Sequence, residues 1–273
     1  MRRDSASFAL WPQQEGKETN GQSLPALDNE TQKDGLDFVH DLITKRARLK
    51  YYNNLRYSNN VLDSSTGTGI WAAEMARQIE RYGGKVVGFG ASNLQLTSNI
   101  PKNLTLLEEG RDDLWGENDR FDLIHTRVLP SDTRNWPEFY KEAYEHLKSG
   151  CYLEIEALNL ELLCDSGGST LESEFFLDHL ILPNTGDDKQ HLNFEKTKEL
   201  LESAGFVNIK EEVINLPINP WREDERDREL GQRFNMVLQF LLKTGQYAPP
   251  DLDSNAPAWE EIYTLGNRGY CRL

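Results

Sequence analysis

The stretch VLDSSTGTGIW, residues 61–71, decides which fold this sequence adopts. A short apolar strand ends at Asp63, a turn carries Gly67 and Gly69, and a helical pattern follows at once. Glycines let a backbone come close to a ligand, and the first turn of a helix offers unpaired N–H groups at the carboxyl end of a sheet. The stretch therefore predicts a nucleotide-type cradle, with an ordinary tight strand–helix turn as the alternative.

The segments around this turn alternate between strand and helix patterns. Strands are predicted at residues 59–65, 85–90, 104–110, 121–127 and 151–158, and helices at 28–49, 69–83 and 136–150. Strands that alternate with helices of about 10–15 residues are typical of a parallel, doubly wound sheet. The sequence therefore predicts an α/β fold of this class.

The same patterns divide the chain into six parts. We expect a flexible leader (1–27), an N-terminal helical cap (28–58), a doubly wound core that carries the predicted cradle (59–158), a lid insertion (159–192), a helix and strand that complete the sheet (193–219), and a C-terminal helical and aromatic cap (220–273).

Charge and composition exclude several classes of partner. The chain has 273 residues, with 30 Lys and Arg against 45 Asp and Glu, a net charge of −15. Such a chain is unsuited to nucleic acid or to an anionic membrane surface, and no apolar run approaches the roughly 20 residues of a spanning helix. The three cysteines, Cys151, Cys164 and Cys271, have no metal-like spacing and suit a reducing compartment. We expect a cytoplasmic protein, with the nucleus as the alternative, and no catalytic metal.

Several stretches resemble the fungal LaeA-like branch of class I S-adenosylmethionine-dependent methyltransferases. They are VLDSSTGTGIWAAEMA (61–76), IHTR (124–127), NWPEFYKEAYEHLKSGCYLEIEA (135–157), ESAGF (202–206) and LPINPW (216–221). The glycine motif is common to class I members, whereas GTGIW, the Trp-Pro pair and LPINPW are more specific to the branch. The resemblance implies a Rossmann-like, doubly wound, mostly parallel sheet of seven strands with a helical cap, and S-adenosylmethionine at the carboxyl ends of the first strands.

The resemblance also implies the residues of the site. Asp63, Ser65, Gly67 and Gly69 would form the cradle, residues 88–92 with Gly90 and Ser92 would face the ribose, and residues 108–113 with Glu109 and Asp112 would approach the adenine. His125 and Arg127 would lie between the cofactor and the substrate.

Three departures from the family pattern predict weakened cofactor binding. Ser65 replaces the first glycine of the D-x-G-x-G-x-G loop, so a Cβ and a hydroxyl enter the region of the methionine part. Gly90 replaces the acidic residue that accepts the ribose hydroxyls, a loss of about 1.5–3 kcal/mol, or roughly ten- to a hundredfold in affinity. The adenine-side motif is rearranged to LEEGRDDLW, residues 107–115. Restoring Gly90→Asp and Ser65→Gly is expected to tighten binding several-fold.

Two residues are candidates for chemistry. His125 is the best-placed general base for the acceptor's proton, with a role in orienting the strand end as the alternative. Arg127 pairs either with an anionic group of the substrate or with Glu156 on the adjacent strand. His40, on the leader helix, is expected to be a surface histidine rather than a residue that closes over the cofactor.

Three functions follow from these features. The first is methyl transfer from S-adenosylmethionine to a small, secondary-metabolite-like acceptor. The second is a repurposed fold that acts as a cyclase, pericyclase or isomerase in natural-product biosynthesis and transfers no methyl group. The third is a non-catalytic regulatory subunit that pairs with a velvet-type protein; a homodimer is a further possible assembly.

Overall fold

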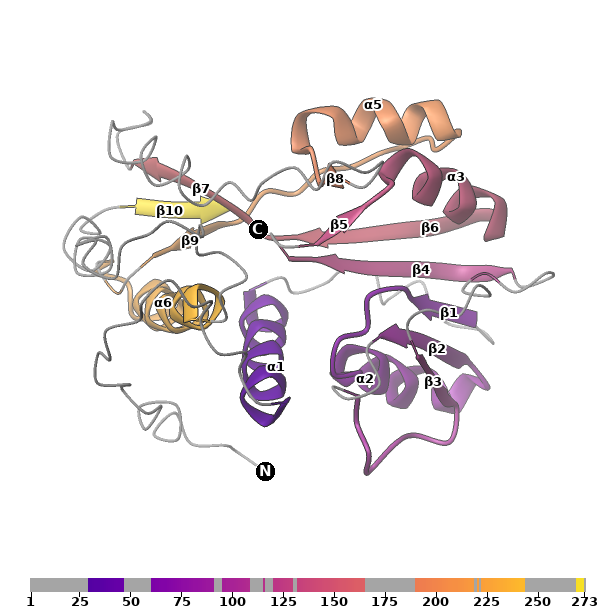
Figure 1. Cartoon of the computed structure of the whole chain (residues 1–273), viewed down its shortest axis with the longest axis horizontal. Helices are drawn as coiled ribbons and strands as arrows, with labels where there is room; N and C mark the ends of the chain where they lie inside the picture. The colour runs from indigo at the N-terminus through magenta and orange to yellow at the C-terminus, as the bar shows by residue number, and fades with distance from the viewer. Residues whose placement is uncertain are drawn as a thin grey trace, which may run out of the picture.

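The computed structural model describes residues 29–46, 60–90, 95–108, 115, 120–129, 132–164, 190–218, 220, 222–243 and 269–272. Its centre is a five-stranded parallel sheet with the strand order β3-β2-β1-β4-β6 (Figure 1). The strands are β1 (Asn60–Asp63), β2 (Lys85–Gly90), β3 (Leu104–Glu108), β4 (Phe121–Val128) and β6 (Leu147–Ala157). Strand order reverses between β1 and β4, and open α/β sheets bind ligands at the carboxyl ends of strands at such a point.

Helices cover both faces of this sheet (Figure 1). On one face lies α2 (Ile70–Ile79), followed by the short helix η3 (Glu80–Tyr82). The opposite face carries α3 (Trp136–His146) and α5 (Phe194–Ala204). The apolar face of α2 packs on Val61, Val86 and Leu123 of the sheet, which fixes the turn that precedes this helix. The predicted α/β, doubly wound fold is confirmed, although the described residues form a main sheet of five strands where the resemblance implied seven.

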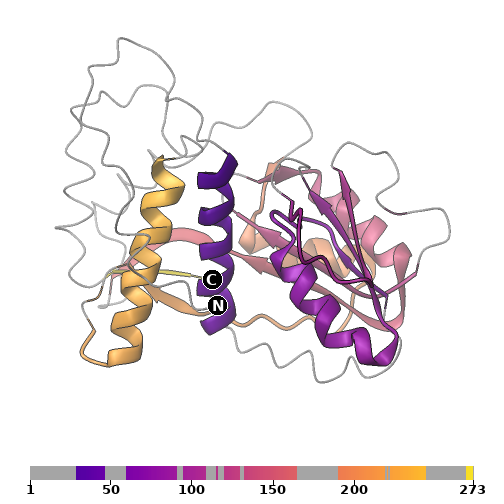
Figure 2. The ribbon, with the colours of Figure 1, turned by 90° about the horizontal axis from the view of Figure 1, so that it is seen from below.

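Two helices from opposite ends of the chain form the cap. Figure 2 shows α1 (Asn29–Arg46) and α6 (Glu225–Lys243) side by side. Their shared core contains Val39, Leu42, Ile43, Leu230, Phe234, Val237, Leu238 and Phe240. The ring of Phe240 occupies the space in which a side chain on Gly35 would lie. Glycine in the middle of α1 therefore lets the two helices come close together.

The strand predicted within residues 193–219 does not complete the main sheet. The strand found there, β9 (Asn215–Pro217), pairs with β10 (Gly269–Arg272), which also pairs with β7 (Asn159–Cys164). These three strands form a separate antiparallel sheet beside α6 (Figure 1). Leu216 of β9 packs into the core shared by α1 and α6, so burial by the cap helices holds this strand away from the main sheet.

The boundary between α3 and β6 also differs from the prediction. The helix ends at His146 and the strand starts at Leu147, whereas the sequence predicted a helix up to Gly150. Lys148 forms an ion pair with Asp122 at 2.8 Å, which holds the start of β6 against β4. A further short pair consists of β5 (Thr133–Arg134) and β8 (Gln190–His191).

Some predicted parts lie outside the described residues. These are the leader (1–27), most of the lid (165–189), and the site candidates Ser92, Glu109 and Asp112.

Within the described ranges, no helix is long and apolar enough to cross a membrane. The same ranges contain no group of three or more side chains arranged to hold a metal ion.

Candidate functional site

The glycine turn lies between the ends of β1, β2 and β4. The amide of Ser64 donates to the carbonyl of His125 at 2.9 Å, and the amide of Thr66 donates to the carbonyl of Phe89 at 2.7 Å. Gly67 and Gly69 have φ angles of 52° and 85°, which favour glycine over residues with a side chain. Among the described residues, a Cβ on Gly67 would meet only Leu36, at 3.8 Å, so these residues leave the backbone there open to a ligand.

Asp63 is committed to contacts inside the protein. Its side chain is fully buried at the end of β1. Oδ2 accepts a hydrogen bond from the Thr66 hydroxyl at 2.7 Å, and Oδ1 lies 2.9 Å from Nδ1 of His125. Asp63 therefore shapes the turn by joining it to β4.

Ser65, the residue at the first glycine position, is half-buried. Its Oγ lies 3.1 Å from the Thr126 hydroxyl and accepts a hydrogen bond from Nη2 of Arg134 at 2.9 Å. The Arg134 guanidinium lies over the ring of Phe139, 4.3 Å from its centroid. The serine hydroxyl thus joins the glycine turn to β4 and to the segment that leads into α3.

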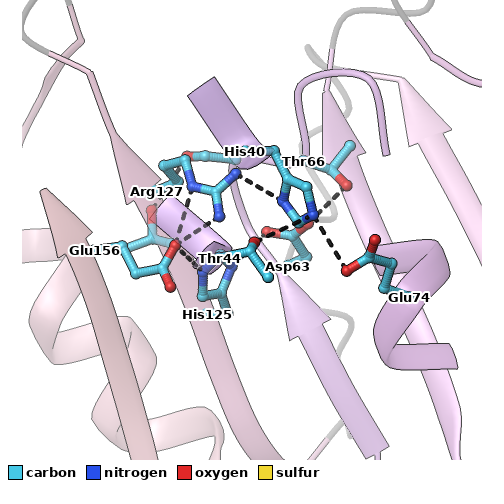
Figure 3. Close-up of polar contacts among 10 residues, drawn as sticks. His40, Thr44, Asp63, Thr66, Glu74, His125, Arg127 and Glu156 are labelled. Atoms are coloured by element: carbon cyan, nitrogen blue, oxygen red, sulfur yellow. Dashed lines mark hydrogen bonds and ion pairs between the residues drawn. The ribbon is translucent and has the colours of Figure 1, made fainter. Parts of the chain in front are cut away.

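His125 is enclosed by two carboxylates and an indole. Its side chain is 1 % exposed, and its Nε2 lies 3.3 Å from Oε2 of Glu156 (Figure 3). Its ring stacks on Trp71, with the ring centroids 3.7 Å apart. Burial alone would lower the pKa of His125. The hydrogen bonds to Asp63 and Glu156, together with the negative charges of these two side chains, outweigh the effect of burial and raise the pKa of His125 to about 9. The imidazole is therefore protonated at neutral pH.

Arg127 pairs with Glu156, which confirms the alternative that the sequence left open. Nη2 and Nε of Arg127 donate to Oε2 of Glu156 at 2.7 and 3.0 Å (Figure 3). Burial raises the pKa of Glu156, but the charge of Arg127 and the contacts with His125 lower it to about 2. His125 and Arg127 of β4 thus share the carboxylate of Glu156 on the adjacent strand β6.

His40 is buried, and the expectation of a surface histidine is wrong. It is 3 % exposed, its Nδ1 lies 3.2 Å from Nη1 of Arg127, and its Nε2 lies 3.2 Å from Oε2 of Glu74 (Figure 3). It therefore connects α1 to β4 and α2. The spacing Leu36, His40 and Ile43 already placed it on the inward stripe of the helix.

Glu154 is a buried carboxyl that the sequence analysis did not select. It lies opposite His125 in the register of β4 and β6. Within the described part of the chain, neither of its buried side-chain oxygens has a hydrogen-bond partner, and burial raises its pKa. The alternation in LEIEA, which puts Glu154 and Glu156 on one face of the strand, was the available signal.

The end of β2 lacks the expected acid but keeps a carboxylate nearby. A Cβ on Gly90 would meet Cγ2 of Thr66 at 2.9 Å and the backbone of Gly67 at 3.3 Å. Opposite Gly90 in the register lies Glu108, the exposed last residue of β3. The open backbone at Gly67 and this exposed carboxylate fit an adenosyl cofactor at the carboxyl edge of the sheet.

Comparison with known proteins assigns the family. Residues 34–211 match the family model described as a methyltransferase domain. The chain belongs to this methyltransferase family. Among its relatives is the secondary metabolism regulator LAE1 of Cochliobolus heterostrophus, 31% identical over 235 residues, which cover 81% of this chain and 74% of that protein. The predicted LaeA-like resemblance is confirmed.

Two further proteins are similar to this chain. The protein-methionine methyltransferase laeA of Emericella nidulans is 28% identical over 229 residues, covering 81% of this chain but only 60% of that longer protein. A solved cyclopropane-fatty-acyl-phospholipid synthase-like protein from Lactobacillus casei has a TM-score of 0.49 and 14% identity, covering 92% of this chain and 93% of that one. The fold assignment of this methyltransferase domain rests on the family match and the observed strand order.

Proposed function

We propose that this chain binds S-adenosylmethionine at its glycine turn and transfers the methyl group to a small, secondary-metabolite-like acceptor. The observation that carries the proposal is the turn itself. Gly67 and Gly69 adopt left-handed conformations between the buried Asp63 and the start of α2, where strand order reverses. The relative named as a protein-methionine methyltransferase supports methyl transfer, and the relative named as a regulator of secondary metabolism supports a role in that metabolism.

Little general acid–base chemistry is required for this reaction. When bound, the cofactor supplies a methyl group on a positively charged sulfur, and the protein's task is to hold the acceptor in line with it. The residues around Gly67 would hold the methionine part, and the exposed carboxyl edge would hold the nucleoside. Methyl transfer therefore does not depend on a free histidine at the mouth of the sheet.

In this proposal His125 and Arg127 are positioning residues instead of the predicted base and substrate anchor. His125 is almost fully buried and already protonated, so it has no free lone pair for the acceptor's proton at neutral pH. Arg127 is paired with Glu156 and lies beside His40. Both side chains hold β4 in register with its neighbours and so fix the strand ends that border the turn.

The test is methyl transfer with a matched pair of glycine variants. The purified chain is incubated with methyl-labelled S-adenosylmethionine and a fungal small-molecule extract, and S-adenosylhomocysteine and labelled product are measured. Gly67→Ala should abolish both. Gly150→Ala is the control. Gly150 also has a positive φ, 78°, and no atom of the described residues lies within 4 Å of its Cβ position, but it lies at the other end of β6. Transfer by neither the wild type nor the control would contradict the proposal.

A non-catalytic regulatory subunit is the second candidate, because LAE1 is named as a regulator. This alternative predicts that the chain forms a stable complex with a partner protein and releases no S-adenosylhomocysteine with any acceptor. The cyclase alternative predicts turnover that does not depend on the cofactor. The labelled-methyl experiment separates methyl transfer from the other two functions, and turnover of a metabolite without the cofactor separates the cyclase from the regulatory subunit.

A further inference from the structure

The end of β2 has no room for a carboxylate in the present arrangement. Cγ2 of Thr66 would lie 2.9 Å from a Cβ on Gly90. The hydroxyl on the same Thr66 side chain donates to Asp63 at 2.7 Å. A rotation that moved the methyl group away would therefore break a buried hydrogen bond. An acidic side chain at residue 90 is incompatible with this turn unless Thr66 changes.

The next strand carries a carboxylate at the matching position. Gly90 of β2 pairs with Glu108 of β3 in parallel register, so their side-chain positions share one face and lie roughly 4.8 Å apart. Leu106 shows which face this is, because its Cδ2 lies 3.2 Å from the Cβ position of Gly69. Two residues further on, Glu108 faces the same side as Leu106, nearer to the carboxyl edge. Its side chain is exposed and open to a ligand.

A buried glutamine holds the two strand ends together. Nε2 of Gln95 donates to the carbonyl of Gly90 at 2.8 Å and to the carbonyl of Leu107 at 2.7 Å. Gln95 is 8 % exposed, so water does not compete for these bonds. The backbone that carries Glu108 is thereby fixed relative to the glycine turn. Glutamate is also one methylene longer than aspartate, which extends its reach toward β2.

We propose that Glu108 accepts the ribose hydroxyls of the nucleoside in place of the acidic residue that β2 lacks. The inference rests on the proposed binding of an adenosyl cofactor. The family pattern assigns residues 108–113 to the adenine, whereas this proposal assigns Glu108 to the ribose. The ligand class is a ribonucleoside with free 2′ and 3′ hydroxyls, because one carboxylate accepts two charge-assisted hydrogen bonds from such a pair.

Calorimetric titration with two nucleosides tests this role. The probes are S-adenosylhomocysteine and its 2′,3′-dideoxy analogue, which lacks both hydroxyls. Glu108→Gln should weaken binding of S-adenosylhomocysteine about tenfold, because it replaces a charged acceptor by a neutral one. Binding of the dideoxy analogue should not change. Glu145→Gln is the matched control, since it removes an exposed carboxylate from α3 on the opposite face of the sheet, and it should alter neither affinity.

The outcomes separate this inference from the proposed function. If the wild type binds S-adenosylhomocysteine but Glu108→Gln changes neither affinity, or weakens both equally, the ribose role of Glu108 is wrong and cofactor binding stands. If the wild type binds neither nucleoside, cofactor binding itself is wrong and the role of Glu108 is wrong with it.

A relocation variant gives an independent check. In Thr66→Ser/Gly90→Asp/Glu108→Gln the methyl group next to residue 90 is removed and the carboxylate is returned to β2. This variant should regain the preference for S-adenosylhomocysteine over the dideoxy analogue that Glu108→Gln loses. Failure to regain it in a folded protein would contradict the proposed equivalence of the two positions.

Discussion

Nδ1 of His125 lies 2.9 Å from Oδ1 of Asp63, and each of the two side chains is only 1 % exposed. The pair joins β4 to β1 at the point where strand order reverses. Since Asp63 also accepts a hydrogen bond from Thr66, the same contact supports the glycine turn. The attraction between protonated His125 and the Asp63 carboxylate therefore helps to stabilise the glycine turn.

Removing one member of this pair should destabilise the protein strongly. We expect His125→Ala to lower the free energy of unfolding by about 3–5 kcal/mol, because it leaves Asp63 charged and buried. Urea unfolding measures the loss. In a double-mutant cycle with Asp63→Asn, the double variant should lose clearly less than the sum of the single variants. Strict additivity would show that the two side chains are not coupled.

The same histidine should make stability fall at alkaline pH. Because the pKa of His125 rises from 6.5 in the unfolded chain to about 9 in the folded one, its contribution is complete below pH 6.5 and disappears as the pH approaches 9. Glu156, with its pKa lowered from 4.5 to about 2, contributes above pH 4.5 and loses this contribution as the pH falls toward 2.

Unfolding of the wild type and of His125→Ala across this range checks the prediction. The difference between them should shrink steadily between pH 6.5 and about 9. A difference that does not depend on pH would contradict a protonated His125 in the folded protein.

Gly35 should resist replacement although it lies inside a helix. Alanine at an exposed helix position would stabilise α1 by about 1 kcal/mol, but here its methyl group would overlap the ring of Phe240 on α6. We therefore expect Gly35→Ala to destabilise the protein by about 1–3 kcal/mol, measured by urea unfolding. Gly35→Ala/Phe240→Leu should recover part of the loss. A stabilised single variant would show that the Phe240 ring of α6 does not lie against Gly35 of α1.

Much of the core was predictable because its signals are local. The strand–turn–helix at residues 61–71 and the alternation of strands and helices appear directly in the sequence, and the structure has the predicted order of these elements. The Arg127–Glu156 pair was among the stated alternatives, since both residues end neighbouring strands.

The remaining features depend on contacts between distant segments. The position of β9 follows from its pairing with β10, whose residues lie near the end of the chain and carry no strong strand pattern. Burial of His40 requires partners on β4 and α2, and the misfit of a side chain at Gly90 requires the rotamer of Thr66. Sequence spacing alone does not contain these relationships.

Restoring the family's acidic residue at position 90 should destabilise the protein. The sequence predicts that restoring Gly90→Asp together with Ser65→Gly tightens cofactor binding, but a Cβ at residue 90 would press on Thr66. We expect the single variant Gly90→Asp to be destabilised by about 1–3 kcal/mol. Thr66→Ser/Gly90→Asp should recover most of the loss, because serine keeps the hydroxyl bonded to Asp63 and lacks the methyl group. Thermal unfolding of both variants measures this. Equal stability of Gly90→Asp and the wild type would show that Thr66 moves freely.

Calorimetric titration of the wild-type protein with S-adenosylhomocysteine tests cofactor binding at the glycine turn most directly. We predict one site per chain with a dissociation constant in the micromolar range, about −8 kcal/mol, and loss of this binding in Gly67→Ala but not in Gly150→Ala. No binding up to millimolar concentration, with the protein folded, would contradict a methyltransferase role for this chain.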